Sequence, residues 1–382
     1  MSCRKPDVKP IGHRMTALAA TALAAVALAA LAILPGCKSR ADDQQGQQQH
    51  RQPEPSTSKP EDRVGPGPAQ GELHLVRVGG KAGFIDDRGV MVIAPIFADA
   101  RPFDGPQAVA RIGSKWGPID RTGQWTAPPE LLDPPDLHDD RTPVFGIGNG
   151  GEDCGYVDSF GRLAIGPQFQ DGRPFHRGLA AVQRGHKWGF ITPRGAPAIE
   201  PQFDSARDFY ESRAAVWLVG KMGFVDRDGK MAIPPTWQIP PGEAAWCDFH
   251  DGRAAVRVDG KWGFVDPDGK VVIPPQFDAV RPFSEGLAAV CQAGRWGFVD
   301  LAGAMKIVPA MAAVDSSGFR GGLAAAADDK GLWGFIDTAG TWAIPARYKR
   351  VGPFQGRLAE VETDAGIGYI DKAGTVVYKP TR

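Results

Sequence analysis

The sequence predicts an all-β fold of nine tandem repeats, and three observations support this. A short core of Gly, an aromatic residue, a β-branched residue and Asp recurs with some substitutions, and five of its eight intervals are 34 residues. A fixed period in this range is typical of repeat arrays. The 49 glycines and 34 prolines, in a chain that is 42% hydrophobic, indicate frequent turns rather than disorder. Each unit also contains three short apolar runs. The nine cores begin at Gly83, Gly117, Gly155, Gly189, Gly223, Gly263, Gly297, Gly334 and Gly368.

The best-formed unit, residues 253–286, shows why each run should be a strand. Residues 254–258 alternate between the two faces and end at Asp259-Gly260, which favours a tight hairpin turn. Residues 261–266 form the second run, and residues 270–273 form a third that stops at Pro274-Pro275, because proline cannot donate a ladder hydrogen bond. The pattern predicts a three-stranded antiparallel meander, followed by a connection over residues 276–286.

Two arrangements of nine meanders are compatible with the pattern. One meander cannot bury both of its faces, so neighbouring units must stack. We expect an elongated or curved β-solenoid, and a closed propeller-like ring is the alternative. Four-stranded blades are usual in propellers, which favours the solenoid for three-stranded units.

The repeated core has a structural explanation at each position. Trp262, Phe264 and Asp266 should share one face, with Gly263 and Val265 on the other. The missing side chain at Gly263 permits close approach of another backbone. Asp266 should begin a turn by accepting hydrogen bonds from amides two residues on. In the connection, the aromatic residues Phe277 and Phe283 should fill the gap between neighbouring meanders.

The N-terminus is typical of an export signal. Residues 1–14 are basic, residues 15–34 carry no charge, and small residues precede Cys37. Residues 1–36 are therefore predicted to be a signal peptide, and the alternative is an uncleaved transmembrane anchor of about 20 residues. Residues 37–72 are rich in Gln, Pro and Ser and predict a disordered tether. Residues 73–382 hold the nine repeats.

Net charge argues against a nucleic-acid partner. The whole chain is formally neutral, and loss of residues 1–36 would leave a net charge of −3. Nucleic-acid affinity depends largely on a field of basic residues, and this chain does not have one.

Two known families are similar to parts of this sequence. Residues 34–37, Leu-Pro-Gly-Cys, resemble the lipobox of bacterial lipoproteins, in which the cysteine is lipid-modified. This implies lipidation of Cys37, and the absence of Asp at position 38 favours the outer membrane. The pattern of Lys261–Val290, with Trp-Gly-Phe-Val-Asp, Ile-Pro-Pro-x-Phe-Asp and Glu-Gly-Leu-Ala-Ala-Val, resembles the bacterial WG (KWG) repeat over about residues 73–378. That resemblance implies a β-rich array on exported bacterial proteins and implies no enzyme activity.

The tryptophans divide into two groups. Those of the repeated core should be structural, because they recur at one place: Trp116, Trp188, Trp262, Trp296 and Trp333. Those outside the core are better candidates for exposure and for a binding role: Trp217, Trp237, Trp246 and Trp342.

Sites for catalysis, metals or cofactors are not indicated. The sequence contains no His-Glu-x-x-His, Gly-x-Ser-x-Gly or phosphate-loop pattern. Asp-x-Asp-Gly at residues 226–229 and 266–269 lacks the remaining ligands of a calcium loop and is better explained by turns. The acidic insertion around His138, with Asp133, Asp136, Asp139 and Asp140, is more simply a solvated loop than a metal or catalytic site. Whether any of Cys154, Cys247 and Cys291 pair stays open.

From the sequence we therefore expect a non-enzymatic, exported lipoprotein. It would be held to a membrane by lipid on Cys37 and present its repeats to a protein or envelope polymer. A carbohydrate-binding module that uses exposed aromatic residues is the first alternative. An enzyme that uses the insertion near His138 is the second.

Overall fold

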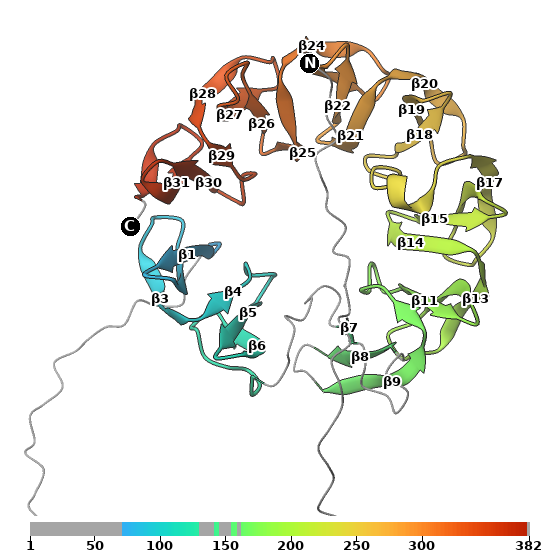
Figure 1. Cartoon of the computed structure of the whole chain (residues 1–382), viewed down its shortest axis with the longest axis horizontal. Coiled ribbons are helices and arrows are strands. Elements are labelled where there is room, and N and C mark those ends of the chain that lie inside the picture. Colours follow the sequence, from blue (N-terminus) through green and yellow to red (C-terminus); the bar gives the residue numbers. More distant parts are fainter. Residues whose placement is uncertain (1–70, 130–140, 145–153, 159–161, 380–382) are drawn as a thin grey trace, which may run out of the picture. The chain divides into compact units, whose positions relative to one another are not determined.

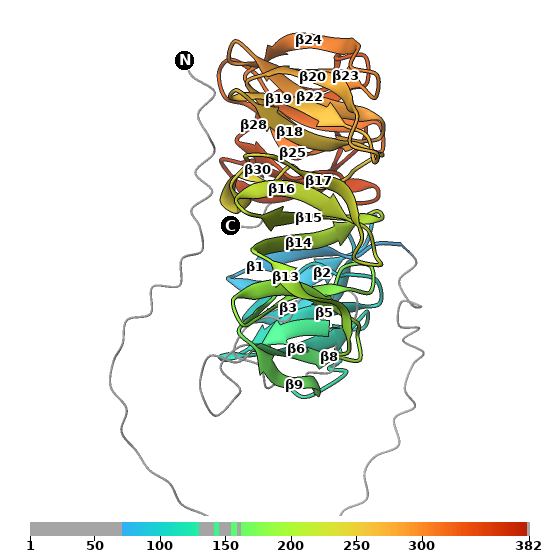
Figure 2. The ribbon, with the colours of Figure 1, turned by 90° about the vertical axis from the view of Figure 1, so that its right-hand side faces the viewer.

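A computed structural model describes residues 71–129, 141–144, 154–158 and 162–379. Within these residues the chain forms nine small antiparallel sheets arranged as the blades of a propeller (Figure 1). The ring is seen edge-on in Figure 2. This confirms the all-β repeat array, and of the two expected arrangements the closed ring is the one adopted. We number the blades I to IX along the chain.

The strands of the first five blades are as follows. Blade I holds β1 (His74–Val78), β2 (Lys81–Ile85) and β3 (Met91–Phe97); blade II holds β4 (Asp99–Ala100), β5 (Gln107–Ile112) and β6 (Lys115–Asp120); blade III holds β7 (Arg141–Val144), β8 (Cys154–Asp158) and β9 (Leu163–Phe169); blade IV holds β10 (Asp171–Gly172), β11 (Ala180–Arg184), β12 (Lys187–Ile191) and β13 (Pro197–Phe203); blade V holds β14 (Ser205–Tyr210), β15 (Arg213–Leu218), β16 (Lys221–Val225) and β17 (Met231–Trp237).

The remaining four blades follow the short helix η2 (Pro241–Glu243). Blade VI holds β18 (Ala254–Val258), β19 (Lys261–Val265) and β20 (Val271–Phe277); blade VII holds β21 (Ala279–Ser284), β22 (Leu287–Gln292), β23 (Arg295–Asp300) and β24 (Met305–Met311); blade VIII holds β25 (Ala313–Arg320), β26 (Leu323–Ala327), β27 (Trp333–Asp337) and β28 (Trp342–Tyr348); blade IX holds β29 (Arg350–Val351), β30 (Leu358–Thr363), β31 (Gly366–Asp371) and β32 (Val376–Tyr378).

The expectation of three strands per unit is wrong for five of these sheets, which have four. The segment expected to be a loop forms an additional strand at the inner edge of the next blade, as β21 does beside β22 (Figure 1). The pairing of β21 with β22 shifts in register between Val280 and Phe283. This shift interrupts the alternation of buried and exposed residues by which a strand is predicted from sequence. The extra strand gives each of these blades the usual four strands of a propeller.

The glycine of the repeated core packs against backbone, as expected. A Cβ on Gly263 would collide with the backbone oxygen of Ile273 and lie 2.6 Å from the backbone nitrogen of Pro275. The β19–β20 register shifts on both sides of Phe264, so the two strands cross tightly here. Seven other core glycines meet backbone in the same way: Gly83, Gly117, Gly155, Gly189, Gly223, Gly297 and Gly334. Glycine is therefore required by strand crossing within the blade.

The aspartate that ends the core holds the next turn. Oδ1 of Asp266 accepts hydrogen bonds from the amides of Asp268 and Lys270, at 3.1 and 2.9 Å. This confirms its expected role. Thr192 stands in this position in blade IV, but its hydroxyl donates to the carbonyl of Ala196 at 3.3 Å rather than accepting from amides. Thr192 therefore does not replace the aspartate as an acceptor in this turn.

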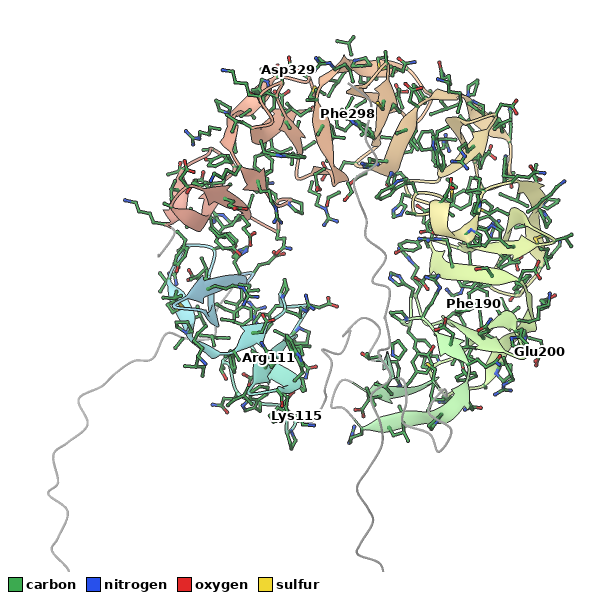
Figure 3. All side chains as sticks on the ribbon, in the orientation of Figure 1. Arg111, Lys115, Phe190, Glu200, Phe298 and Asp329 are labelled. Carbon is green, nitrogen blue, oxygen red and sulfur yellow. The ribbon has the colours of Figure 1, made fainter. Side chains whose placement is uncertain are left out.

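Aromatic rings fill the junctions between blades, as the sequence predicted. The ring of Phe264 in blade VI meets Phe283 on the inner strand of blade VII edge to face, with centroids 4.9 Å apart. Six further junctions contain the equivalent pair: Phe84–Phe103, Tyr156–Phe175, Phe190–Phe209, Phe224–Phe249, Phe298–Phe319 and Phe335–Phe354. Phe190 and Phe298 lie within the wall of the ring, whereas Glu200 and Asp329 lie at its outer margin (Figure 3).

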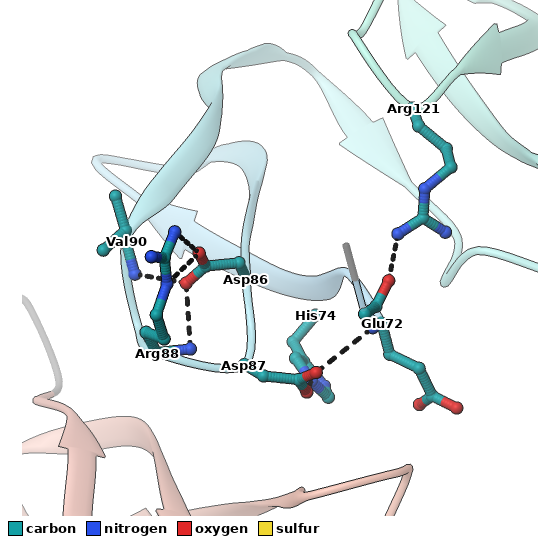
Figure 4. Close-up of polar contacts among 8 residues, drawn as sticks. Glu72, His74, Asp86, Asp87, Arg88, Val90 and Arg121 are labelled. Atoms are coloured by element: carbon teal, nitrogen blue, oxygen red, sulfur yellow. Dashed lines mark hydrogen bonds and ion pairs between the residues drawn. The ribbon is translucent and has the colours of Figure 1, made fainter. Parts of the chain in front are cut away.

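The first and last blades meet and close the array. His74 of blade I takes the place of the junction phenylalanine, and its ring lies 5.5 Å from that of Tyr369 in blade IX. The Tyr369 hydroxyl donates to the carbonyl of Leu75 at 2.5 Å. His74 is held in turn by Asp87, which also accepts from the amide of Glu72 (Figure 4). This junction joins residues 294 positions apart and excludes an open solenoid.

The insertion before blade VI replaces an inner strand. The ring nitrogen of Trp217 donates to the carbonyl of Ile239 at 2.6 Å, and Ile239 and Cys247 are fully buried. Asp248 accepts three hydrogen bonds from Arg207: two from Nε, at 2.9 and 3.2 Å, and one from a terminal NH2 group at 2.6 Å. The insertion therefore packs into the core between blades V and VI.

Candidate functional site

One row of hairpin turns surrounds the described ring on a single face. We call them the rim turns: each joins the inner strand of a blade to the second strand. The first of their two central residues is Gly105 in blade II, Arg177 in IV, Glu211 in V, Asp251 in VI, Glu285 in VII, Gly321 in VIII and Gly356 in IX.

All of these central residues have left-handed backbone geometry. Arg177, Glu211, Asp251 and Glu285 have φ between 49° and 53°, and the three glycines have φ between 57° and 61°. Residues other than glycine adopt this region at a cost of order 1 kcal/mol or more, and they persist where their surroundings require them. Neutral residues such as Ala293 have the same φ at other two-residue hairpin turns, so a role of the four charged side chains is judged from their contacts.

Three of the four side chains link one blade to the next. Glu211 of blade V accepts from the amide of Gly252 in blade VI at 3.1 Å, and Asp251 of blade VI accepts from Gly286 in blade VII at 2.8 Å. Glu285 of blade VII spans two amides of blade VIII, Gly321 and Gly322, at 2.6 and 2.9 Å. We call this series the carboxylate ladder. It covers the junctions from blade V to blade VIII.

The ladder stops where the rim residue becomes glycine. Blades VIII, IX and II carry Gly321, Gly356 and Gly105, and these three residues line a cavity of about 770 Å³. The rest of the lining comes from the rim of blade VII, the start of blade I and Arg121. A Cβ on Gly105 would meet nothing within 4 Å. The three glycines therefore contribute backbone but no side chain to the lining of this cavity.

Charged groups of both signs surround this cavity. Nζ of Lys372 donates to the carbonyl of Gly321 at 3.1 Å. Arg121 donates to the carbonyl of Gly71 (Figure 4). The Glu72 carboxylate lies beside Gly356, about where a side chain on that glycine would be. A lining with charges of both signs suits a ligand that is held by a few specific polar contacts, rather than one attracted by a large net charge.

On the opposite half of the rim, three rings form a row in which each ring is tilted against the next. His176 of blade IV lies 4.8 Å from Tyr210 of blade V, and Tyr210 lies 5.1 Å from His250 of blade VI, measured between ring centroids. Burial lowers the pKa of His250 and raises the pKa of Tyr210. These side chains follow the junction phenylalanine in their blades, so the row belongs to the same turns as the ladder.

A buried carboxyl group lies next to this row. Burial raises the pKa of Asp208, against the opposing effect of Arg173 and His176. Its Oδ1 atom has no hydrogen-bond partner among the described residues. Neighbouring Asp248 is neutralised by Arg207, with only 5% of the Asp248 side chain exposed. The part of the chain that the structure describes contains no group of three or more His, Cys, Asp or Glu able to hold a metal ion.

The expected exposure of the tryptophans outside the core is largely wrong. Trp217 and Trp237 are only 2% and 6% exposed, because they pack in the blade V–VI core beside the insertion. Trp246 is half-buried, and the guanidinium of Arg281 lies 4.7 Å from its ring. Trp342 alone is exposed, at 36%. These positions form no aromatic ridge.

The tryptophans of the repeated core are structural, as expected. Trp116, Trp188, Trp262 and Trp296 are buried and Trp333 is half-buried. The arginine of the Arg-Pro-Phe segment covers several of them, and Arg281 lies between Trp246 and Trp296 at 4.7 Å from each ring. Arg281 is only 9% exposed, whereas the equivalent Arg101 is exposed.

Cys154 and Cys247 are free and buried. Cys154 occupies a tryptophan position as a fully buried apolar side chain, and burial raises the pKa of its thiol to about 12. Burial also raises the pKa of Cys247. The predicted lipidation site Cys37 and the acidic segment with Asp133, Asp136, His138, Asp139 and Asp140 lie outside the described residues. No described helix has the length and apolar character needed to cross a membrane.

The carboxylate ladder was not anticipated, although its signal is present in the sequence. The residue two positions after the junction phenylalanine is acidic after Phe209, Phe249 and Phe283, and glycine after Phe103, Phe319 and Phe354. This change from acidic residue to glycine is visible when the units are aligned. The sequence does not show that the acidic side chains bind the turn of the next blade, because that depends on which turns are neighbours in the fold.

The comparisons with known proteins concern family and fold. The model of the "WG containing repeat" matches residues 83–116, 155–188, 188–216, 246–262, 262–296 and 333–364. No curated protein sequence matches the chain. Among solved structures, a eukaryotic initiation factor is similar with a TM-score of 0.51 and 10% identity, over 80% of this chain and 95% of that one.

Two other solved structures resemble the chain more weakly. Citrobacter koseri AztD has a TM-score of 0.34 and 13% identity, over 81% of this chain and 93% of that one. Kluyveromyces lactis Hsv2p also has a TM-score of 0.34, with 11% identity over 53% of this chain and 74% of that one. At these identities the similarity concerns the fold alone. The family model and the nine sheets together show that WG-containing repeats run across this chain and build its propeller.

Proposed function

We propose that this chain is a non-enzymatic binding or scaffold protein of a bacterial cell envelope, exported and anchored by lipid on Cys37. The signal-like residues 1–36 and the lipobox-like residues 34–37 support export and anchoring. The repeats of residues 73–382 would be carried by the tether of residues 37–72. We favour the outer membrane as its location and a protein as its partner.

The observation that carries the binding role is the cavity at the glycine half of the rim. A volume of about 770 Å³ is in the range of ligand sites in proteins. The rim turns of four blades and the start of blade I contribute to it, and the strands of the blades support these turns. A site supported in this way can hold a partner group without rearrangement of the ring.

A carbohydrate-binding module is the alternative. Burial of Trp217 and Trp237 weakens it, because sugar stacking requires an accessible ring face. An enzyme that uses the insertion near His138 has no supporting observation among the described residues.

The binding role can be tested by capture from envelope extract with the full-length, C-terminally tagged protein in mild detergent. Gly105→Gln places a side chain in the cavity at a position with open space, and Gly79→Gln makes the same change at a turn on the other face, where φ is 57° and space is also open. We expect Gly105→Gln to reduce capture at least fivefold and Gly79→Gln to leave it unchanged. Equal capture by both variants would exclude the cavity, and recovery of glycan in place of protein would support the alternative.

The anchor is tested separately by fatty-acid labelling and membrane fractionation of Cys37→Ser. We expect loss of label and accumulation of an uncleaved precursor. A labelled or normally processed Cys37→Ser protein would refute lipidation at this residue. Normal membrane retention without label in the unaltered chain would favour the transmembrane anchor.

A further inference from the structure

The junction between blades VIII and IX lacks the carboxylate that joins the preceding blades. Glu285 holds the two rim amides of blade VIII, those of Gly321 and Gly322. The equivalent amides of blade IX belong to Gly356 and Arg357. Neither donates a hydrogen bond within the described part of the chain, and both residues are exposed. The residue that would supply their acceptor is Gly321.

The junction lacks an acidic side chain at Gly321 and is electropositive on one side. Nζ of Lys372 occupies the space where a side chain on Gly321 would begin, and a Cβ there would collide with it. The exposed Arg320 precedes Gly321, and exposed Arg357 lies in the facing turn. Two acidic side chains lie nearby. Glu285 binds the amides of blade VIII, and the carboxylate of Glu72 lies beside Gly356 on the side of blade I.

Other rim junctions differ from this one. Between blades IV and V the ladder position holds the exposed Arg177, which has no acceptor on its side chain and whose carbonyl accepts from Arg227 at 2.8 Å. In blade II the second central residue is Pro106, which has no amide hydrogen to donate. Among the described junctions, only that of blades VIII and IX combines three features: two rim amides without an acceptor, a glycine in the place of the carboxylate residue, and a position in the cavity wall.

We infer that this junction binds a carboxylate of the partner, on the side chain of a glutamate in an acidic peptide. The ligand carboxylate would accept from the amides of Gly356 and Arg357, as Glu285 does from Gly321 and Gly322 one blade earlier, and would lie close to Nζ of Lys372. Hydrogen bonds to a charged acceptor are stronger than neutral ones. We favour a peptide over an acidic sugar because the equivalent amides one blade earlier bind a glutamate side chain, that of Glu285. This inference deepens the proposed function and rests on it.

The direct probe is the capped dipeptide acetyl-Glu-Leu-amide, compared with acetyl-Gln-Leu-amide, which has the same shape without the charge. Binding to the full-length protein is measured by saturation-transfer NMR at constant ionic strength. We expect the Glu peptide to bind at least tenfold more tightly than the Gln peptide. Equal binding of the two peptides, or binding of neither, would overturn the inference.

Two variants localise the site. Gly321→Glu restores the ladder from within, because its φ of 61° resembles the 53° of Glu285 and the obstructing Lys372 end can move and pair with it. We expect this variant to lose Glu-peptide binding at least tenfold, and Gly79→Glu, with the same charge on the other face, to retain it. Lys372→Gln leaves every glycine in place and should weaken binding several-fold. Unchanged binding in both Gly321→Glu and Lys372→Gln would place the peptide elsewhere.

The result also separates this inference from the broader proposal. If envelope capture depends on Gly105 but neither peptide binds, the cavity remains the binding site and the carboxylate assignment is wrong. If capture does not depend on Gly105, the proposed cavity function itself fails.

Discussion

At the scale of single residues, the repeated glycine is the position with the least tolerance. A Cβ at Gly263 meets main-chain atoms of Ile273 and Pro275, which cannot move without separating two strands. We predict that Gly263→Ala destabilises the protein by about 1–3 kcal/mol, as other overpacked sites do. The matched control is Gly166→Ala, where a Cβ meets nothing within 4 Å. Thermal unfolding of the two variants should show a lower midpoint for Gly263→Ala alone.

The aspartates in the turns and connections make the folding stability depend on pH at low pH. Backbone hydrogen bonds, led by that of Ala304, lower the pKa of Asp300 from its ordinary value of 3.8, and the Lys261 ammonium does the same for Asp278. The unfolded chain therefore binds more protons just below pH 3.8, so stability is full above this value and falls as the pH drops through the lowered pKa values.

We predict that the unfolding midpoint is flat from about pH 5 to 7 with respect to these groups and declines below about pH 4. Asp300→Asn keeps a neutral acceptor in the turn and should make the decline shallower. A decline as steep as that of the unaltered chain would remove Asp300 from this effect.

At the scale of elements, the insertion of blade VI shows how a loop can replace a strand. Asp248 is nearly buried and depends on Arg207 for its hydrogen bonds. Removing one partner of such a pair leaves a buried charge, which typically costs about 3–5 kcal/mol. We predict that Asp248→Ala has an effect of this size on the free energy of unfolding.

A double-mutant cycle provides the control for this pair. Arg207→Met with Asp248→Ala removes both charges, so the double variant should be more stable than Asp248→Ala alone. Additive losses in the cycle would show that the two side chains do not stabilise each other.

The elements also show what the sequence could and could not predict. Hairpins, turn aspartates and junction rings follow from local pattern, and the positions of Asp266 and Phe283 were anticipated. The inner strand around Arg281-Pro282-Phe283 was not, because a proline and a register shift disguise its alternation. Burial of Trp217 could not be foreseen either, since it depends on an insertion that begins some 20 residues later.

At the scale of the whole molecule, ring closure determines what the candidate site is. The cavity exists only because blades VII to IX lie beside blades I and II. Sequence period gives the number of blades but not the curvature, which follows from the small rotation between neighbouring units. The carboxylate ladder and its gap could not be predicted for the same reason, because each carboxylate and the amide it binds belong to different repeats.

Closure of the ring also makes the two ends of the repeat region depend on each other. In an open array each repeat contacts only its neighbours, so loss of the last repeat affects the one before it. In the ring, blade IX also covers blade I, where Val76 and Ile85 pack with Leu358 and Tyr369.

The most direct measurement is amide hydrogen exchange on the full chain and on a chain that ends at residue 349 and so lacks blade IX. The closed ring predicts loss of protection in β1–β3 of blade I as well as in β25–β28 of blade VIII. If protection falls in blade VIII while β1–β3 keep the rates of the full chain, the array is open, and the cavity that depends on its closure does not form.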